Sequence, residues 1–122
     1  MSVLENKNAM KKIVMLLLSV LLVGCDPCSN TVVGNAVSPD GKYEATAFIR
    51  NCGATTANSP QVYLGPKGER IKESGNVFIG NHSDQVRIQW LSSTQLVIHS
   101  ECDVSMLATN YGHIVIQYVR DK

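Results

Sequence analysis

The cysteines and histidines are the most chemically versatile residues of this sequence. The chain holds four cysteines, Cys25, Cys28, Cys52 and Cys102, and three histidines, His82, His99 and His113, in 122 residues. Thiols can form disulfides, bind metal ions or carry a covalent modification, and imidazoles can bind a metal ion or act as a base. Their spacing decides which of these uses the sequence supports.

The spacing gives no support to a metal or catalytic site. The sequence has no His-x-x-x-His motif and no Gly-x-Ser-x-Gly motif. Ligand-type side chains gather in segment 99–103, but on an extended strand His99 and Cys102 point to opposite faces. A nucleophile and a histidine base could still meet in space. We therefore predict no catalytic residue, no metal ligand and no cofactor, which favours a protein without enzymatic activity.

The N-terminal segment has the pattern of a secretory signal peptide. Lys11 and Lys12 precede an almost entirely apolar run over residues 13–23. Eleven helical residues span about 16 Å, which is roughly half of a bilayer's hydrocarbon core and too short to cross it. We expect residues 1–24 to be removed, whether synthesis starts at the first methionine or at Met10.

The end of this apolar run resembles the lipobox of bacterial lipoproteins. Leu22, Val23 and Gly24 stand at the lipobox positions, and Cys25 stands at the position of the lipidated cysteine. The resemblance implies attachment of diacylglycerol to the Cys25 thiol and cleavage before Cys25, and two or three acyl chains anchor a protein stably. The alternative is a plain signal peptide that happens to be followed by a cysteine.

The residue after Cys25 bears on location. In enterobacterial lipoproteins an aspartate such as Asp26 resembles the signal that retains a lipoprotein in the inner membrane, although Pro27 is not the usual reinforcing residue. We expect a bacterial membrane protein that is anchored by lipid and faces the periplasm or the exterior. The inner membrane is favoured over the outer membrane.

Composition and charge limit the remaining function classes. The chain is 44% hydrophobic and 17% charged, which is typical of a globular protein and argues against disorder. Residues 25–122 carry eight basic and nine acidic side chains, and their number suits a single domain. A protein without a basic excess is poorly suited to binding nucleic acid, so no nucleic-acid partner is expected.

The apolar residues of the mature chain recur with a period of two. Segment 86–90 alternates apolar and polar residues, and segment 96–98 repeats the pattern after a short polar loop, which predicts a hairpin. Segment 43–49 alternates as well, with Phe48 out of step. Segment 114–119 is apolar on almost every position, which predicts a strand covered on both sides.

Further short strands and turns complete the expected architecture. Shorter strands are expected at 62–64, at 77–79 and at 31–37, whereas 104–109 could make a helical turn. Turn sequences separate the strands: Ser38-Pro39-Asp40-Gly41, Gly65-Pro66-Lys67-Gly68, Gly80-Asn81 and Asn110-Tyr111-Gly112. Six or seven short strands at this spacing predict an all-β fold, as a small antiparallel β-sandwich or a barrel-like sheet. The predicted organisation is a signal peptide at 1–24, a lipid anchor and tether at 25–36 and a β domain at 37–122.

Three thiols remain once Cys25 is assigned to lipid. Outside the cytoplasm thiols tend to oxidise, so one disulfide and one remaining thiol are expected. Cys28, Cys52 and Cys102 allow three pairings, and their spacing does not choose among them.

Two motifs resemble a family of small bacterial lipoproteins of unknown function. They are Ser38-Pro39-Asp40-Gly41-Lys42-Tyr43 and Arg50-Asn51-Cys52-Gly53-Ala54-Thr55-Thr56, and the second is the more specific. The resemblance covers most of the mature chain and implies a disulfide between Cys28 and Cys52. Cys102 would then be a buried thiol or a link to another chain. The resemblance implies no activity.

The second motif also holds the best candidate for a binding loop. Its residues are Arg50, Asn51, Gly53, Thr55 and Thr56. A glycine and two threonines beside a disulfide could present N–H groups and hydroxyls in a fixed geometry. The alternative is that Gly53 permits a tight turn and the threonines bond to their own backbone.

These observations favour a lipid-anchored envelope lipoprotein that acts as a non-enzymatic binding module. Its partners would be the membrane, through the lipid on Cys25, and an unidentified envelope protein or ligand. One alternative is a periplasmic inhibitor or immunity-type lipoprotein that blocks a lytic enzyme, an idea that depends on analogy. A second alternative is a small hydrolase, which would need a pocket lined by histidine and aspartate.

Overall fold

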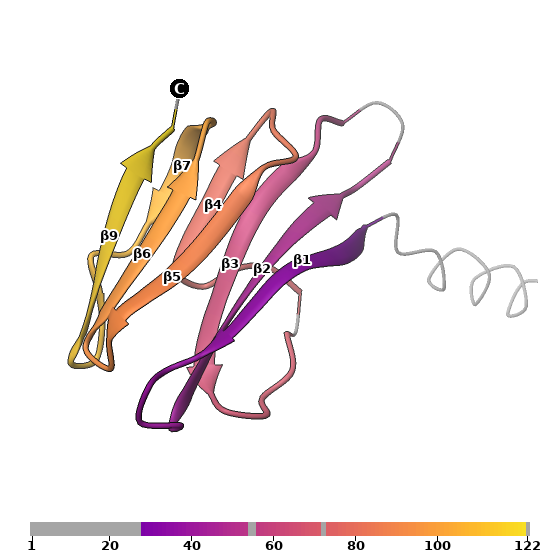
Figure 1. The fold of residues 1–122 in the computed structure, drawn as a ribbon. Coiled ribbons are helices and arrows are strands. Elements are labelled where there is room, and N and C mark those ends of the chain that lie inside the picture. The colour runs from indigo at the N-terminus through magenta and orange to yellow at the C-terminus, as the bar shows by residue number, and fades with distance from the viewer. Residues whose placement is uncertain (1–27, 54–55, 72, 122) are drawn as a thin grey trace, which may run out of the picture.

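The described part of the chain folds into nine β-strands. The computed structural model describes residues 28–53, 56–71 and 73–121, and this part contains no helix (Figure 1). The strands are β1 (Ser29–Val37), β2 (Tyr43–Asn51), β3 (Ser59–Pro66), β4 (Phe78–Asn81), β5 (Val86–Ser92), β6 (Gln95–Ser100), β7 (Asp103–Leu107), β8 (Asn110–Tyr111) and β9 (Ile114–Arg120). The all-β expectation is confirmed, with more strands than the six or seven expected. Accordingly, no helix in these three stretches is able to span a membrane.

The strands form two sheets that pack as a sandwich. One sheet has the order β1-β2-β3-β4-β7, and the other has the order β5-β6-β9-β8. All neighbouring strands are antiparallel except β6 and β9, which pair in parallel. The expectation of a purely antiparallel fold is therefore wrong at this pair. The chain leaves β6, crosses to the other sheet as β7 and returns before β9, and such a crossover is what parallel pairing requires.

The core lies between the two sheets. Its buried side chains come from both layers: Ala45, Ala47, Val62, Leu64, Val77, Phe78, Leu96, Ile98, Cys102, Ile114 and Ile116. In β9 only one face is buried, because Val115 is 53% exposed between two buried isoleucines. The expectation that 114–119 is covered on both sides is therefore wrong. The outer face of β9 has no layer packed over it in the described part of the chain.

The opposite case is β2, whose residues Ala45–Ile49 are buried on both faces. Phe48 points away from the inter-sheet core and is nevertheless fully buried. The segment between β3 and β4 covers this outer face. The Gly75 N–H donates to Gln61 Oε1 at 2.7 Å, and Gln61 is the partner of Phe48 in the sheet. This cover explains why Phe48 is out of step with the alternation of its strand.

Two local expectations are wrong. Residues 29–36, expected to belong to a tether, are part of β1, which begins at Ser29 and pairs with β2 from there. The segment 104–109 makes no helical turn, because residues 104–107 belong to β7, where Leu107 pairs with Phe78. In contrast, the predicted hairpin of β5 and β6 is confirmed, with Ile88 opposite Ile98.

Side-chain bonds join the two sheets where their edge strands β1 and β5 lie side by side. The indole of Trp90 in β5 donates to the carbonyl oxygen of Ala36 in β1 at 2.9 Å. The Asp40 N–H donates to Ser93 Oγ, also at 2.9 Å. β1 and β5 belong to different sheets and form no ladder with each other. These two bonds therefore hold the two sheets together at one end of this edge of the sandwich.

The turn between β1 and β2 is held by the side chains of its own motif. Ser38 Oγ donates to Asp40 Oδ1 at 2.6 Å, and the Lys42 N–H donates to the same oxygen at 3.1 Å. Gly41 has a φ of 75°, which favours glycine. The Ser38 hydrogen bond, followed by the Lys42 N–H, lowers the pKa of Asp40 below its usual 3.8, because both stabilise the ionised carboxylate.

This turn gives a pH-dependent prediction. A lowered pKa in the folded state stabilises the protein only while Asp40 is ionised, so the contribution is present above pH 3.8 and is lost as the pH falls through the folded pKa. Ser38→Ala should raise the pKa of Asp40 in an NMR titration of its carboxyl carbon. Ser93→Ala, which removes a contact to the Asp40 N–H only, should leave it nearly unchanged. Equal pKa values in wild type and Ser38→Ala would contradict this account.

Candidate functional site

Several predicted site residues lie outside the part of the chain that the structure describes. These are the lipidation residue Cys25, the lipobox residues Leu22, Val23 and Gly24, the sorting residue Asp26, and Thr55 of the candidate loop. Their predicted roles stay predictions.

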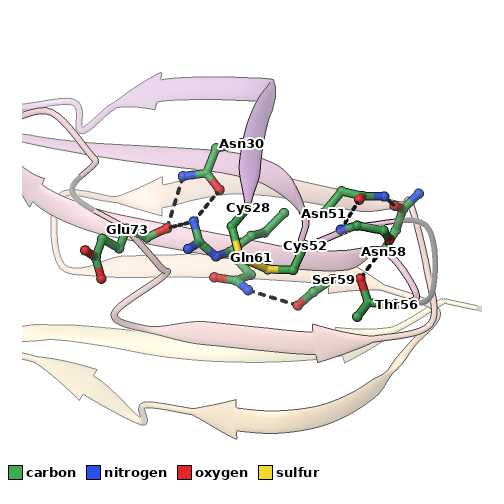
Figure 2. Close-up of a disulfide and its surroundings, with 11 residues drawn as sticks. Cys28, Asn30, Asn51, Cys52, Thr56, Asn58, Ser59, Gln61 and Glu73 are labelled. Carbon is green, nitrogen blue, oxygen red and sulfur yellow. Dashed lines mark hydrogen bonds between the residues drawn. A yellow bond between two sulfur atoms is a disulfide. The ribbon is translucent and has the colours of Figure 1, made fainter. Parts of the chain in front are cut away.

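A disulfide joins Cys28 and Cys52, the pairing that the resemblance implies (Figure 2). Cys28 directly precedes β1, and Cys52 directly follows β2. The neighbouring residues Ser29 and Asn51 face each other in the β1–β2 ladder. The bridge therefore closes the end of this pair of strands, beside its last backbone partners.

The candidate loop after β2 uses most of its polar groups internally. Asn51 Oδ1 accepts the Gly53 N–H at 2.9 Å, and Asn51 Nδ2 donates to Asn58 Oδ1 at 2.7 Å (Figure 2). The N–H and Oγ1 of Thr56 both donate to the Gly53 carbonyl, at 3.2 and 3.0 Å. Gly53 has a φ of 125°, so the turn requires glycine. These contacts favour the alternative of a self-satisfied turn at the residues described.

Arg50 acts as a clamp among three segments. Its guanidinium donates to Asn30 Oδ1 in β1 at 2.9 Å and to the carbonyl oxygen of Glu73 in the segment between β3 and β4. Asn30 Nδ2 donates to the same Glu73 oxygen at 3.0 Å (Figure 2). Arg50 thus holds the start of β1 and the outer cover against β2, a role that the residue type alone did not indicate.

A cleft of about 370 Å³ lies at the same end of the sandwich, between Val33 of β1 and the facing ends of β5 and β6. His99, whose side chain is 16% exposed, lies there with Nδ1 3.3 Å from Asp121 Oδ1. Arg87 Nη2 lies 3.5 Å from the other oxygen of Asp121. The cleft therefore combines an imidazole, a guanidinium and three carboxylates, those of Asp84, Glu101 and Asp121, with an apolar wall.

Sequence reasoning missed this grouping. His99 and Asp121 are far apart in the chain, and they meet because β6 pairs in parallel with β9, where His99 lies opposite Val119. Arg87 joins them because it lies opposite His99 in the β5–β6 hairpin. The hairpin was predictable, but the parallel pair was not. The only available signal was a carboxylate directly after the last strand.

The contacts of the cleft bear on whether its residues are held for a reaction. The carboxylate of Asp121 orients the His99 ring, but the neighbouring Ser100 hydroxyl donates to the Gln85 carbonyl at 2.6 Å and so is not held as a nucleophile. In the described residues no three histidine, cysteine or acidic side chains are grouped to hold a metal ion.

Cys102 is a buried free thiol, which is one of the two roles expected for it. Its sulfur lies 3.1 Å from Ser100 Oγ and belongs to the core. Burial in the core removes this thiol from reach of another chain in the folded protein.

The disulfide gives a prediction on stability. Cys28→Ser and Cys52→Ser should each lower the free energy of unfolding by about 2–5 kcal/mol, since either change frees the loop in the unfolded chain. The double variant should lose no more than either single variant, and all should be compared by denaturant unfolding.

Reductant and Cys102→Ala serve as the controls. Reducing agent should destabilise wild type and Cys102→Ala by a similar amount and leave Cys28→Ser unaffected. A wild type that is insensitive to reductant under conditions that free all thiols would contradict the stabilising role of the bridge.

The comparisons with known proteins can now be set beside this geometry. No curated protein and no solved structure matches the chain. A family model described as a family of unknown function, DUF5412, matches residues 9–112. The match takes in β1–β8 and both cysteines of the disulfide. The chain therefore belongs to DUF5412, a family of unknown function.

Proposed function

We propose that the protein is a bacterial envelope lipoprotein, anchored through lipid on Cys25, whose β-sandwich is a non-enzymatic binding module. It faces the periplasm or the exterior, and Asp26 favours the inner membrane over the outer membrane. Its second partner is an envelope protein or ligand that the geometry of the chain does not identify.

The observation that carries the proposal is the Cys28–Cys52 disulfide. Disulfides persist in oxidising compartments and are rare in the bacterial cytoplasm, so the bond supports export of the domain. The charged start and apolar run before Gly24 are typical of an export signal. Two features with different physical origins, thiol oxidation and hydropathy, thus support the same location.

The binding role is supported by the cleft beside β1. The guanidinium and the imidazole lie on strands β5 and β6, and the orienting carboxylate of Asp121 directly follows β9, where its N–H donates to the Ser100 carbonyl at 2.9 Å. Preformed polar groups of this kind favour recognition of a ligand or a peptide. The Ser100 hydroxyl, which neighbours the pair His99–Asp121, donates to the Gln85 carbonyl and so is not held as a nucleophile for that pair. This arrangement favours binding over hydrolysis.

The lipid anchor is tested by Cys25→Ala. Wild-type protein should take up labelled palmitate in bacterial cells, because only a thiol at residue 25 accepts diacylglycerol. Cys25→Ala should take up none, and Cys102→Ala, the matched control, should be labelled like wild type. Labelling of Cys25→Ala at the wild-type level would overturn the lipoprotein assignment.

The sorting role of Asp26 gives a separate prediction. In an enterobacterial host, Asp26→Ser should move the protein from the inner-membrane fraction to the outer-membrane fraction of a sucrose gradient. Asp26→Glu, which keeps the negative charge, shows whether charge alone is sufficient. If Asp26→Ser and wild type sediment together, Asp26 carries no sorting information in this chain.

A further inference from the structure

We infer that the sandwich end closed by the Cys28–Cys52 disulfide lies against the headgroups of the membrane that anchors the protein. The opposite end then points away from the membrane and is the end open to other envelope components. The inference rests on the lipid attachment proposed above for Cys25.

The length of chain before the described residues limits where the domain can lie. Two residues lie between Cys25 and Cys28, and the three Cα–Cα steps that join these cysteines span at most about 11 Å when fully extended. Each headgroup layer of a bilayer is about 5–7 Å thick. With the acyl chains of Cys25 in the hydrocarbon core, Cys28 stays within a few ångströms of the headgroup surface.

Cys28 cannot act as a flexible joint that lets the domain move away. The disulfide fixes it to Cys52, and the ladder of β1 with β2 begins at the next residue, Ser29. The clamp of Arg50 on Asn30 holds the same start of β1. The height of Cys28 above the membrane therefore sets the height of the whole sandwich end.

The register of the strands shows which segments share this end. Ser29 pairs with Asn51, the neighbouring Arg50 pairs with Ser59, and Asn81 pairs with Asp103 at the same end of the sheet. In Figure 1 the start of β1 and the tips of β2 and β9 lie toward the upper side, and the β1–β2 turn lies at the lower side. Strands of seven to nine residues separate the two ends by roughly 25 Å.

The chemistry around Cys28 suits a headgroup layer. The side chains are neutral amides and hydroxyls together with one guanidinium and one carboxylate: Asn30, Arg50, Asn51, Thr56, Asn58, Ser59 and Glu73 (Figure 2). Amides, hydroxyls and a guanidinium can donate hydrogen bonds to the phosphate and glycerol oxygens of the headgroups. The corner around Cys28 thus fits the interface chemically as well as sterically.

The other corner of the same end is acidic. It carries the carboxylates Glu101, Asp103 and Asp121 against the guanidinium groups Arg87 and Arg120, and the carboxylate of Asp84 lies between this corner and Asn58. The negative surface potential of a bilayer with anionic lipids repels this corner. We therefore expect the sandwich to tilt, with the corner at Cys28 closest to the membrane.

The test uses the lipidated full-length mature protein in nanodiscs with anionic lipid and a small fraction of lipid that carries a gadolinium chelate. NMR line broadening of backbone amides then reports distance from the headgroups. The amides of Asn30 and Asn58 should broaden several-fold more than those of Asp40 and Gly112, and more than that of Asp103. A variant with a long Gly/Ser insertion between Pro27 and Cys28 keeps the anchor and should lose most of this contrast.

Each outcome separates the inference from the proposed function. Co-elution with nanodiscs but equal broadening at the two ends of the sandwich would overturn the orientation and leave the lipid anchor standing. Protein that does not co-elute with nanodiscs would overturn the lipid anchor and the orientation with it. If the difference in line broadening between the two ends persists unchanged in the insertion variant, the short tether is not the cause of the orientation.

Discussion

The covalent bond between Cys28 and Cys52 is the constraint on which the rest of the structure depends. It fixes the start of an edge strand, β1, that has a ladder on one side only. The other contacts of β1 are single bonds, such as those from Trp90 and Arg50. Closing a loop with a sequence separation of 24 stabilises the fold by about 3 kcal/mol on the chain-entropy model, a large share for a domain of this size.

The same bond relates the fold to the proposed function. The proposed export would place the disulfide in a compartment where disulfides persist, and its position three residues after the proposed lipid site would make the sandwich begin at the membrane. The cleft of His99 and Asp121 lies at the acidic corner of this end, which the proposed tilt holds away from the headgroups. A ligand would then reach the cleft from the side turned away from the membrane, and the far end of the sandwich stays open to a protein partner.

Local sequence patterns predicted the structural features that depend only on residues close together in the chain. Alternation and a polar loop predicted the hairpin of β5 and β6, because period and turn are local properties. They did not predict β7, the parallel pair or the burial of Phe48, because each depends on a segment far along the chain. The disulfide followed from a resemblance rather than from spacing, and the pair His99–Asp121 needed the crossover that local signals do not encode.

The most direct test of this account is the mass of one cross-linked peptide. The protein would be purified from bacterial membranes, blocked at free thiols, digested with trypsin without reduction and measured by mass spectrometry. We predict a species in which residues 25–42, with diacylglycerol on Cys25, are joined through Cys28 to residues 51–67. A blocked thiol at Cys28 or Cys52, or a peptide that begins upstream of an unmodified Cys25, would contradict it.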